Sequence, residues 1–192
     1  MTRTATEELD APRPTVLQGR VWVLRDAEGR IIDDIDTDMI FHNAHLAVKE
    51  LDQMGQYALG NLAGYEDFPG RVQPGDLILA GRNFGAGSSR QQAVDCFVAL
   101  GCSALLAESF GAIYKRNAIN AGFPIMAAGG LTELASSDGG PLVRTGDELR
   151  VDLRTGMVTH LPSSQQHQAG AMSGVQLDIY QAGDLFAFGA SR

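Results

Sequence analysis

The sequence has few cysteines and nothing that resembles a metal-binding cysteine motif. Its two cysteines, Cys96 and Cys102, lie six positions apart and outside any C-x-x-C arrangement. This spacing suits neither a disulfide nor a metal site. It favours a reduced pair of thiols and therefore a cytoplasmic location.

Basic residues and long apolar runs are also scarce. Fifteen Lys and Arg stand against 23 Asp and Glu, which gives a formal net charge of −8. Nucleic acids and anionic membranes are bound by basic surfaces, so neither is an expected partner. No apolar run approaches the roughly 20 residues of a membrane helix. The first 18 residues also lack the apolar segment of a signal peptide. A locally basic site for a small anion is still compatible with an acidic chain.

The length of 192 residues is enough for one domain with a sizeable core. Residues 1–18 are predicted to be a flexible polar arm, and residues 19–192 a single domain that opens with a strand at 19–24. Residues 161–175 form a predicted polar connector before a C-terminal element that is either a strand or a helix. Alternating apolar and polar residues around Gly156 indicate a β-hairpin.

The middle of the chain alternates short apolar runs with stretches of helical periodicity. The runs at 77–80, 104–107 and 124–127 are typical of buried strands, and the stretches at 89–100 and 112–121 of helices. This order predicts an α/β domain with a parallel or mixed sheet covered by helices.

A glycine-rich loop, Gly81–Arg90 with the sequence GRNFGAGSSR, separates the first of these strands from the first helix. Its glycines permit sharp turns and the close approach of a ligand. A helix start offers free N–H groups, and Arg90 adds a guanidinium fork suited to a carboxylate or phosphate. Ser88 and Ser89 are natural caps for the helix. The loop is therefore a candidate anion site.

Three interpretations of this loop compete on the residues alone. It is a capped helix start with a solvated Arg90, a nucleotide phosphate site, or a carboxylate site in which a serine does chemistry. The spacing is not G-x-G-x-x-G, and no G-K-[ST] follows, which weakens the second. A serine beside an arginine at a helix start has its alkoxide stabilised, as a base or nucleophile requires. No G-x-S-x-G elbow is present, so a hydrolase triad is not expected.

The run N-F-G-x-G-S-S-R, followed by A-E-S-F-G-A-I-Y-x-R-N-A-I-N-x-G-x-P, resembles the swivel domain of the aconitase superfamily. As a chain that consists of this domain alone, the protein resembles the small subunit family of isopropylmalate isomerase. The resemblance covers approximately residues 19–158. The resemblance implies a β/β/α domain with a mixed sheet or barrel. It also implies that Ser88 is the base and that Arg90 holds a substrate carboxylate, with Ser89 and Gly87 beside them in the binding site.

A second motif, Asp36–Ile40 with the sequence DTDMI, resembles the D-T-D-x-I of the same family. By position, the resemblance implies that Asp38 is one of the substrate-binding residues; the alternative is an Asx turn at the entry to the next segment. The run DTDMIFHN is also similar to a dimethylmalate dehydratase-like branch. His42 and His45 are open to interpretation as half a metal site, as surface or interface residues, or as polar groups that face the substrate.

The residues after this motif bear on the substrate. A homoaconitase-like member is expected to carry an arginine near Ala47, whereas Ala47 and Val48 offer only apolar surface. An extra carboxylate left unpaired there would cost several kcal/mol. The expected substrate is therefore a 2-hydroxy diacid with a small apolar substituent, such as isopropylmalate or dimethylmalate.

The family's hydro-lyase reaction uses a [4Fe-4S] cluster, which usually needs three cysteine thiolates when one iron stays open. Two cysteines cannot supply them, so the resemblance implies a cluster on a large partner subunit and none on this chain. A heterodimer or heterotetramer is expected, with self-association of the isolated subunit left open. The implied role is a dehydratase or isomerase small subunit of amino-acid biosynthesis, leucine biosynthesis in particular. The alternatives are the small subunit of a dimethylmalate dehydratase or of a homoaconitase, and a non-catalytic anion-binding or regulatory module of the same fold.

Overall fold

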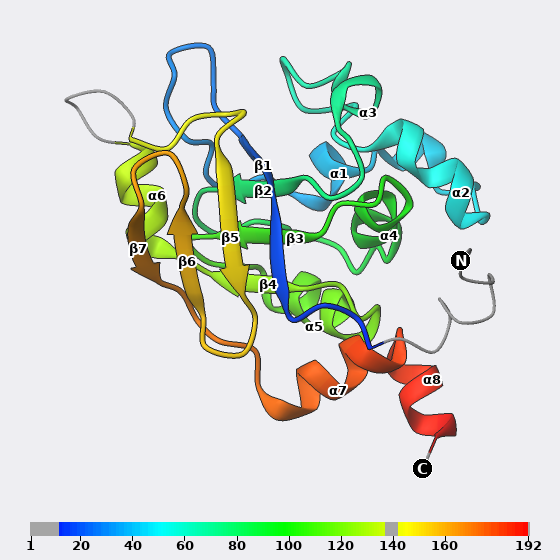
Figure 1. Cartoon of the computed structure of the whole chain (residues 1–192). Helices are drawn as coiled ribbons and strands as arrows, with labels where there is room; N and C mark the ends of the chain where they lie inside the picture. Colours follow the sequence, from blue (N-terminus) through cyan, green and yellow to red (C-terminus); the bar gives the residue numbers. More distant parts are fainter. Residues whose placement is uncertain (1–11, 137–141, 192) are drawn as a thin grey trace, which may run out of the picture.

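The computed structural model describes residues 12–136 and 142–191. These residues form one seven-stranded sheet in the order β4-β3-β2-β1-β5-β6-β7 (Figure 1). The pairs from β1 to β4 are parallel, and the pairs from β1 through β5 and β6 to β7 are antiparallel. The strands are β1 (Val16–Val23), β2 (Leu77–Ala80), β3 (Ala104–Ala107), β4 (Ile125–Ala127), β5 (Glu148–Asp152), β6 (Met157–His160) and β7 (Gln165–Gln168).

Short helices surround this sheet, and none in the described ranges is long and apolar enough to cross a membrane (Figure 1). They are α1 (Thr37–Ile40), α2 (Leu51–Met54), α3 (Phe68–Arg71), α4 (Gln92–Ala99), α5 (Ala112–Asn120), α6 (Gly129–Ala135), α7 (Gly174–Ala182) and α8 (Leu185–Ala190). Two 3-10 turns, η1 (Asn43–His45) and η2 (Gly55–Tyr57), flank α2.

The parallel half of the sheet is buried on both faces, because its strands contribute alternate residues to two apolar clusters. Ile78 of β2 packs with Phe97 of α4 in one cluster, whereas Leu77 and Leu79 pack with Val151 of β5 in the other. All four residues of β2, and all four of β3, are buried. This explains why these strands are continuous apolar runs without alternation. The predicted α/β class and mixed sheet are confirmed.

The predicted flexible arm at 1–18 is wrong for residues 12–18; residues 1–11 lie outside the described residues. β1 begins at Val16, three residues earlier than predicted, and pairs with β5. Ahead of it, Arg13 donates to the Tyr180 carbonyl at 2.8 Å, and its guanidinium lies 4.3 Å from the centre of the Tyr180 ring. These contacts attach the segment to α7.

The predicted connector at 161–175 contains a strand, β7, which pairs with β6 along its whole length. Its sequence, QQHQ, has no apolar alternation because the strand lies at the sheet edge with mostly exposed side chains. The C-terminal element left open between strand and helix is helical, as α7 and α8. The hairpin around Gly156 is confirmed by the pairing of β5 with β6.

Candidate active site

The glycine-rich loop and the DTDMI segment lie side by side, although about fifty residues separate them in the sequence. Backbone hydrogen bonds join them: the Gly85 amide donates to the Ile35 carbonyl at 2.7 Å, and the Thr37 amide donates to the Ala86 carbonyl at 2.8 Å. Asp36 and Ala86 form a parallel bridge between these bonds. The two motifs therefore belong to one site.

Two glycines allow the loop to take this course. Gly85 has φ of +75°, and a Cβ placed on it would lie 2.2 Å from Cγ of the buried Tyr114. Gly87 has φ of +97°, and its missing Cβ would touch Oγ1 of Thr37 at 3.4 Å. Only glycine satisfies both the backbone angle and the close packing at Gly85.

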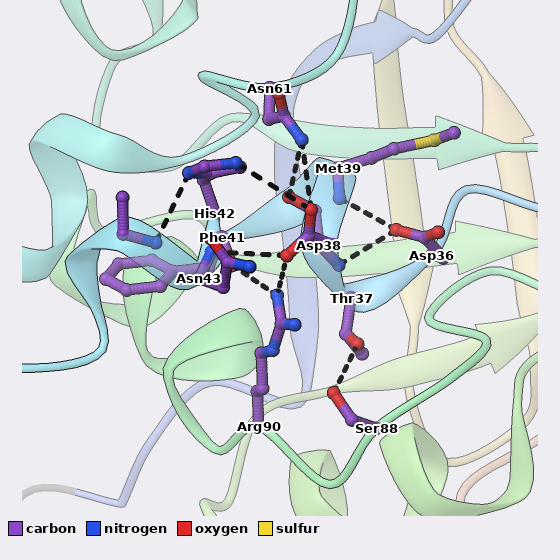
Figure 2. Close-up of polar contacts among 11 residues, drawn as sticks. Asp36, Thr37, Asp38, Met39, Phe41, His42, Asn43, Asn61, Ser88 and Arg90 are labelled. Carbon is purple, nitrogen blue, oxygen red and sulfur yellow. Dashed lines mark hydrogen bonds and ion pairs between the residues drawn. The ribbon is translucent and has the colours of Figure 1, made fainter.

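The two aspartates of the DTDMI segment have different roles. Asp36 caps α1, because its Oδ1 accepts hydrogen bonds from the amides of Asp38 and Met39, each at 2.8 Å. This is the Asx-type turn that the sequence allowed. Asp38 instead points toward the glycine-rich loop and meets Arg90 (Figure 2). The Asp36 cap holds the first turn of α1 in place, and Asp38, which lies in that turn, directs its carboxylate toward Arg90.

Asp38 and Arg90 form the central ion pair of the site, with 2.5 Å between Oδ1 and Nη1 (Figure 2). Nη1 also donates to the Phe41 carbonyl at 3.0 Å. The hydrogen bond from Arg90 holds the pKa of Asp38 below its usual range, helped by the Asn43 amide and opposed by partial burial. Within residues 12–136 and 142–191, Nε and Nη2 of Arg90 have no hydrogen-bond partner, so the side-on fork that binds carboxylates stays available.

Ser88 lies next to this pair, exposed on the loop, with its Oγ 3.2 Å from Oγ1 of the buried Thr37 (Figure 2). Ser89 and Gly87 are also exposed. The expectation that Ser88 and Ser89 cap the helix is wrong, since α4 starts at Gln92 and its N-cap, Gln91, makes no side-chain cap bond. The side-chain contact of Ser88 is therefore with the hydroxyl of Thr37 and not with a helix start that it caps.

Asn61 is a site residue that no motif in the sequence pointed to. Its side-chain amide donates to Oδ2 of Asp38 at 3.2 Å and to the Asp38 carbonyl at 3.3 Å. The Asn43 amide donates to Oδ1 of Asp38 at 3.2 Å, and Nε2 of His42 lies 3.9 Å from Oδ2. No sequence signal marks Asn61, because it reaches Asp38 from a turn 23 residues further along.

Asp38, Ser88 and Arg90 come together as predicted, whereas Ala47 and Val48 do not join them through any contact of the described residues. Ala47 is exposed, and Val48 is half-buried and packs against the apolar cluster of α4. Their role as an apolar wall for the substrate stays a prediction.

The two cysteines do not suit the ligation of an iron–sulfur cluster. Both are buried, and burial raises the pKa of Cys96 strongly and that of Cys102 to about 12, so neither offers a thiolate. Among the described residues, no three His, Cys, Asp or Glu side chains are grouped so as to hold a metal ion.

Comparison with known proteins identifies the class. The Aconitase C-terminal domain family matches residues 37–127, which include Asp38 and the glycine-rich loop. The crystal structure of 3-isopropylmalate dehydratase from Methanocaldococcus jannaschii superposes with a TM-score of 0.77 at 29% identity, covering 92% of this chain and 95% of that one. The fold is thus that of an aconitase-type domain.

Full-length relatives narrow this class to a family. The chain is 33% identical to the isopropylmalate/citramalate isomerase small subunit of M. jannaschii, over 91% of this chain and 94% of that protein. It is 35% identical to the methanogen homoaconitase small subunit of Methanothermobacter thermautotrophicus, over 88% of each chain. It is 38% identical to the 3-isopropylmalate dehydratase small subunit of Pyrobaculum calidifontis, over 83% of this chain and 92% of that protein. The chain belongs to the 3-isopropylmalate dehydratase small subunit family, as its motifs predicted.

Proposed function

We propose that this chain is the small subunit of a two-subunit hydro-lyase that removes water from a 2-hydroxy diacid and adds it back. The observation that carries the proposal is the Asp38–Arg90 pair beside Ser88, on two loops joined by backbone hydrogen bonds. The relatives with different substrates are similarly identical to this chain, so identity alone does not select the diacid.

Arg90 is suited to bind a carboxylate of the substrate. Its Nη1 is fixed by Asp38 and the Phe41 carbonyl, which orients the guanidinium before the substrate arrives. The Nε–Nη2 edge then offers two parallel N–H donors to one carboxylate. Asp38 in this view is a positioning residue: it fixes the side chain of Arg90 and does not touch the substrate.

Ser88 is suited to take the proton from the carbon next to the one that bears the hydroxyl. Oγ1 of Thr37 lies 3.2 Å from Oγ of Ser88, and a hydrogen bond donated by Thr37 would stabilise the alkoxide form of Ser88. In dehydration the Cα–H or Cβ–H proton passes to Oγ of Ser88, and an enoate remains after the hydroxyl departs. In rehydration Ser88 returns the proton; an isomerase then adds hydroxyl and proton with their positions exchanged.

The cluster of this enzyme class, when bound, supplies a Lewis acid for the departing hydroxyl. The buried thiols of this chain do not fit it, so the proposal places it on a large partner subunit that faces Ser88 and Arg90. A cytoplasmic location is part of the same proposal, supported by two free cysteines that stay reduced there.

The test is turnover by the complex of this chain with its candidate large subunit, assembled without oxygen. Isopropylmalate, dimethylmalate, citrate and homocitrate are offered to wild type and to Ser88→Ala. Ser191→Ala is the matched control, since Ser191 is also exposed but lies at the end of α8. The proposal expects turnover of at least one diacid, its loss in Ser88→Ala, and normal rates in the control. A complex with an intact cluster and no turnover would instead favour the non-catalytic anion-binding module.

A further inference from the structure

A second group of polar side chains gathers outside the active site, around the turn that joins β6 to the edge strand β7 (Figure 1). Nδ1 of His160 lies 2.8 Å from Oγ of Ser163, and Nε2 of the same ring lies 3.0 Å from Oδ2 of Asp147. A hydroxyl, an imidazole and a carboxylate are thus joined in series by two hydrogen bonds. This is the arrangement in which a base activates a nucleophile and a third group orients the base.

The two hydrogen bonds determine where the protons of this group lie. The Asp147 carboxylate can only accept, so the neutral His160 ring carries its proton on Nε2 and donates it to Asp147. Nδ1 is therefore an acceptor, and the hydroxyl of Ser163 donates to it. The Gln165 amide donates to the same Oγ at 3.4 Å, which suits an oxygen whose own proton points at the ring. His160 consequently has the position of a base for the Ser163 proton.

The base is held by the fold, whereas the serine is open to solvent. His160 is only 4% exposed and lies at the end of β6, paired with Gln165 of β7. Asp147 is held by the Arg144 amide, which donates to its Oδ2 at 2.8 Å. Ser163 is exposed, so a small electrophile can reach its Oγ without any rearrangement of the core.

Hydrogen-bond donors for a developing oxyanion lie next to the serine. In the part of the chain that the structure describes, the backbone amides of Ser163 and Ser164 donate to no acceptor. N–H groups beside a nucleophile can stabilise the negative charge that forms on a carbonyl oxygen when the carbon is attacked. The turn therefore presents free N–H groups together with an activated hydroxyl.

No sequence motif marks this group, and the absence of a G-x-S-x-G elbow argued against a serine triad. The serine lies on a hairpin turn, and the aspartate precedes β5. The two ends meet because the Leu161 amide donates to the Glu148 carbonyl at 3.0 Å, which holds the end of β6 against the start of β5. Only the pairing of these strands brings the three side chains together.

We propose that Ser163 is a nucleophile that accepts an acyl group from an activated ester, with His160 as its base and Asp147 as the residue that orients the base. Oγ of Ser163 bonds to the carbonyl carbon, and its proton passes to Nδ1 of His160. The bond from that carbon to the leaving oxygen breaks, and the ring returns the proton to the leaving group. This step uses neither a partner subunit nor the Asp38–Arg90 pair, so it is independent of the proposed function.

The test is acetylation of the full chain by p-nitrophenyl acetate. Release of p-nitrophenol is followed by absorbance, and the acetylated residue is identified by mass spectrometry of peptides. Wild type is expected to acquire one acetyl group rapidly, on Ser163, and Ser163→Ala to lose this fast phase. Ser164→Ala is the matched control, because Ser164 is an exposed serine of the same turn that contacts no imidazole in the described structure. It should leave the rate unchanged.

Two comparisons separate activation by the histidine from mere exposure of the serine. Asp147→Asn keeps an oxygen for the Arg144 amide but removes the charge that stabilises the protonated ring, so acetylation of Ser163 should slow about 100-fold or more. Wild type unfolded in urea should lose the same advantage, and this comparison decides if Asp147→Asn does not fold by circular dichroism. Equal acetylation of Ser163 and Ser164 in the folded chain, or a Ser163 rate that survives unfolding, would overturn the proposal.

Discussion

Replacement of Gly85 by alanine tests whether the active loop is held in place by packing against Tyr114. The new Cβ would lie 2.2 Å from Cγ of Tyr114 and 2.5 Å from its Cβ and Cδ2. Tyr114 is only 1% exposed, stacks on Phe110 and meets Phe84 edge-on, so it has little room to move. The positive φ of Gly85 costs about 1 kcal/mol with alanine, and overpacking a buried ring adds about 1–3 kcal/mol.

The expected loss in free energy of unfolding is therefore about 2–4 kcal/mol, measured as the shift of the urea midpoint by circular dichroism. Gly64→Ala is the matched control, because Gly64 has φ of +84° and a Cβ added there would meet nothing within 4 Å. The free energy of unfolding of Gly64→Ala should fall only by the cost of the positive φ, about 1 kcal/mol. Equal losses in the two variants would refute the packing argument. A second check is Tyr114→Ala, which should partly rescue Gly85→Ala and give a non-additive double mutant.

Three further predictions concern single side chains. Ser88→Ala should lower turnover by about 10²–10⁴-fold in the complex while the thermal midpoint stays unchanged, because the residue is exposed; a large loss of stability would argue against a catalytic role. Burial raises the pKa of Asp76, but hydrogen bonds from Arg20 and its other donors outweigh this and lower it. The stabilisation from Asp76 is thus complete above the unfolded pKa of about 4 and is lost as pH falls through the folded pKa. Asp76→Asn should destabilise at pH 7 and flatten the decline in urea midpoint from about pH 5 to 3; an unchanged acid profile would contradict this. Tyr114→Phe should be neutral or raise the free energy of unfolding by about 1 kcal/mol in urea titrations, since the Tyr114 hydroxyl is buried without a partner in the described structure; a clear destabilisation would reveal a partner.

Strands β2, β3 and β4 of the parallel half could be predicted almost to the residue, whereas β1 begins three residues earlier than predicted. The bounds of β2 and β3 match the apolar runs at 77–80 and 104–107, because strands covered on both faces leave a continuous apolar signal. The apolar pattern does not identify β7. This edge strand is stabilised by backbone pairing with β6, and such pairing leaves no signature in the polarity of the side chains.

Site residues that belong to a recognisable motif could be predicted. Residues that join the site only through a contact between distant segments could not. Asp38, Ser88 and Arg90 were located by motif, and the structure brings them together. The start of α4 was misplaced by three residues, because Ser88 and Ser89 are favourable cap residues by type but the helix begins after Gln91, without a side-chain cap. Asn61 was missed because its effect depends on a contact between two turns, and sequence spacing carries no record of it.

The central position of β1 has a consequence for how the protein is made. A ribosome releases β1 first, and β2, β3 and β4 follow soon enough to form the parallel half beside it. The other edge of β1 pairs with β5, whose partner residues begin at Glu148. Until that segment emerges, the nascent chain carries an unpaired strand edge, the kind of surface through which chains associate wrongly. Synthesis that pauses before Glu148 should leave the nascent chain dependent on chaperones, and completion of the hairpin should release it.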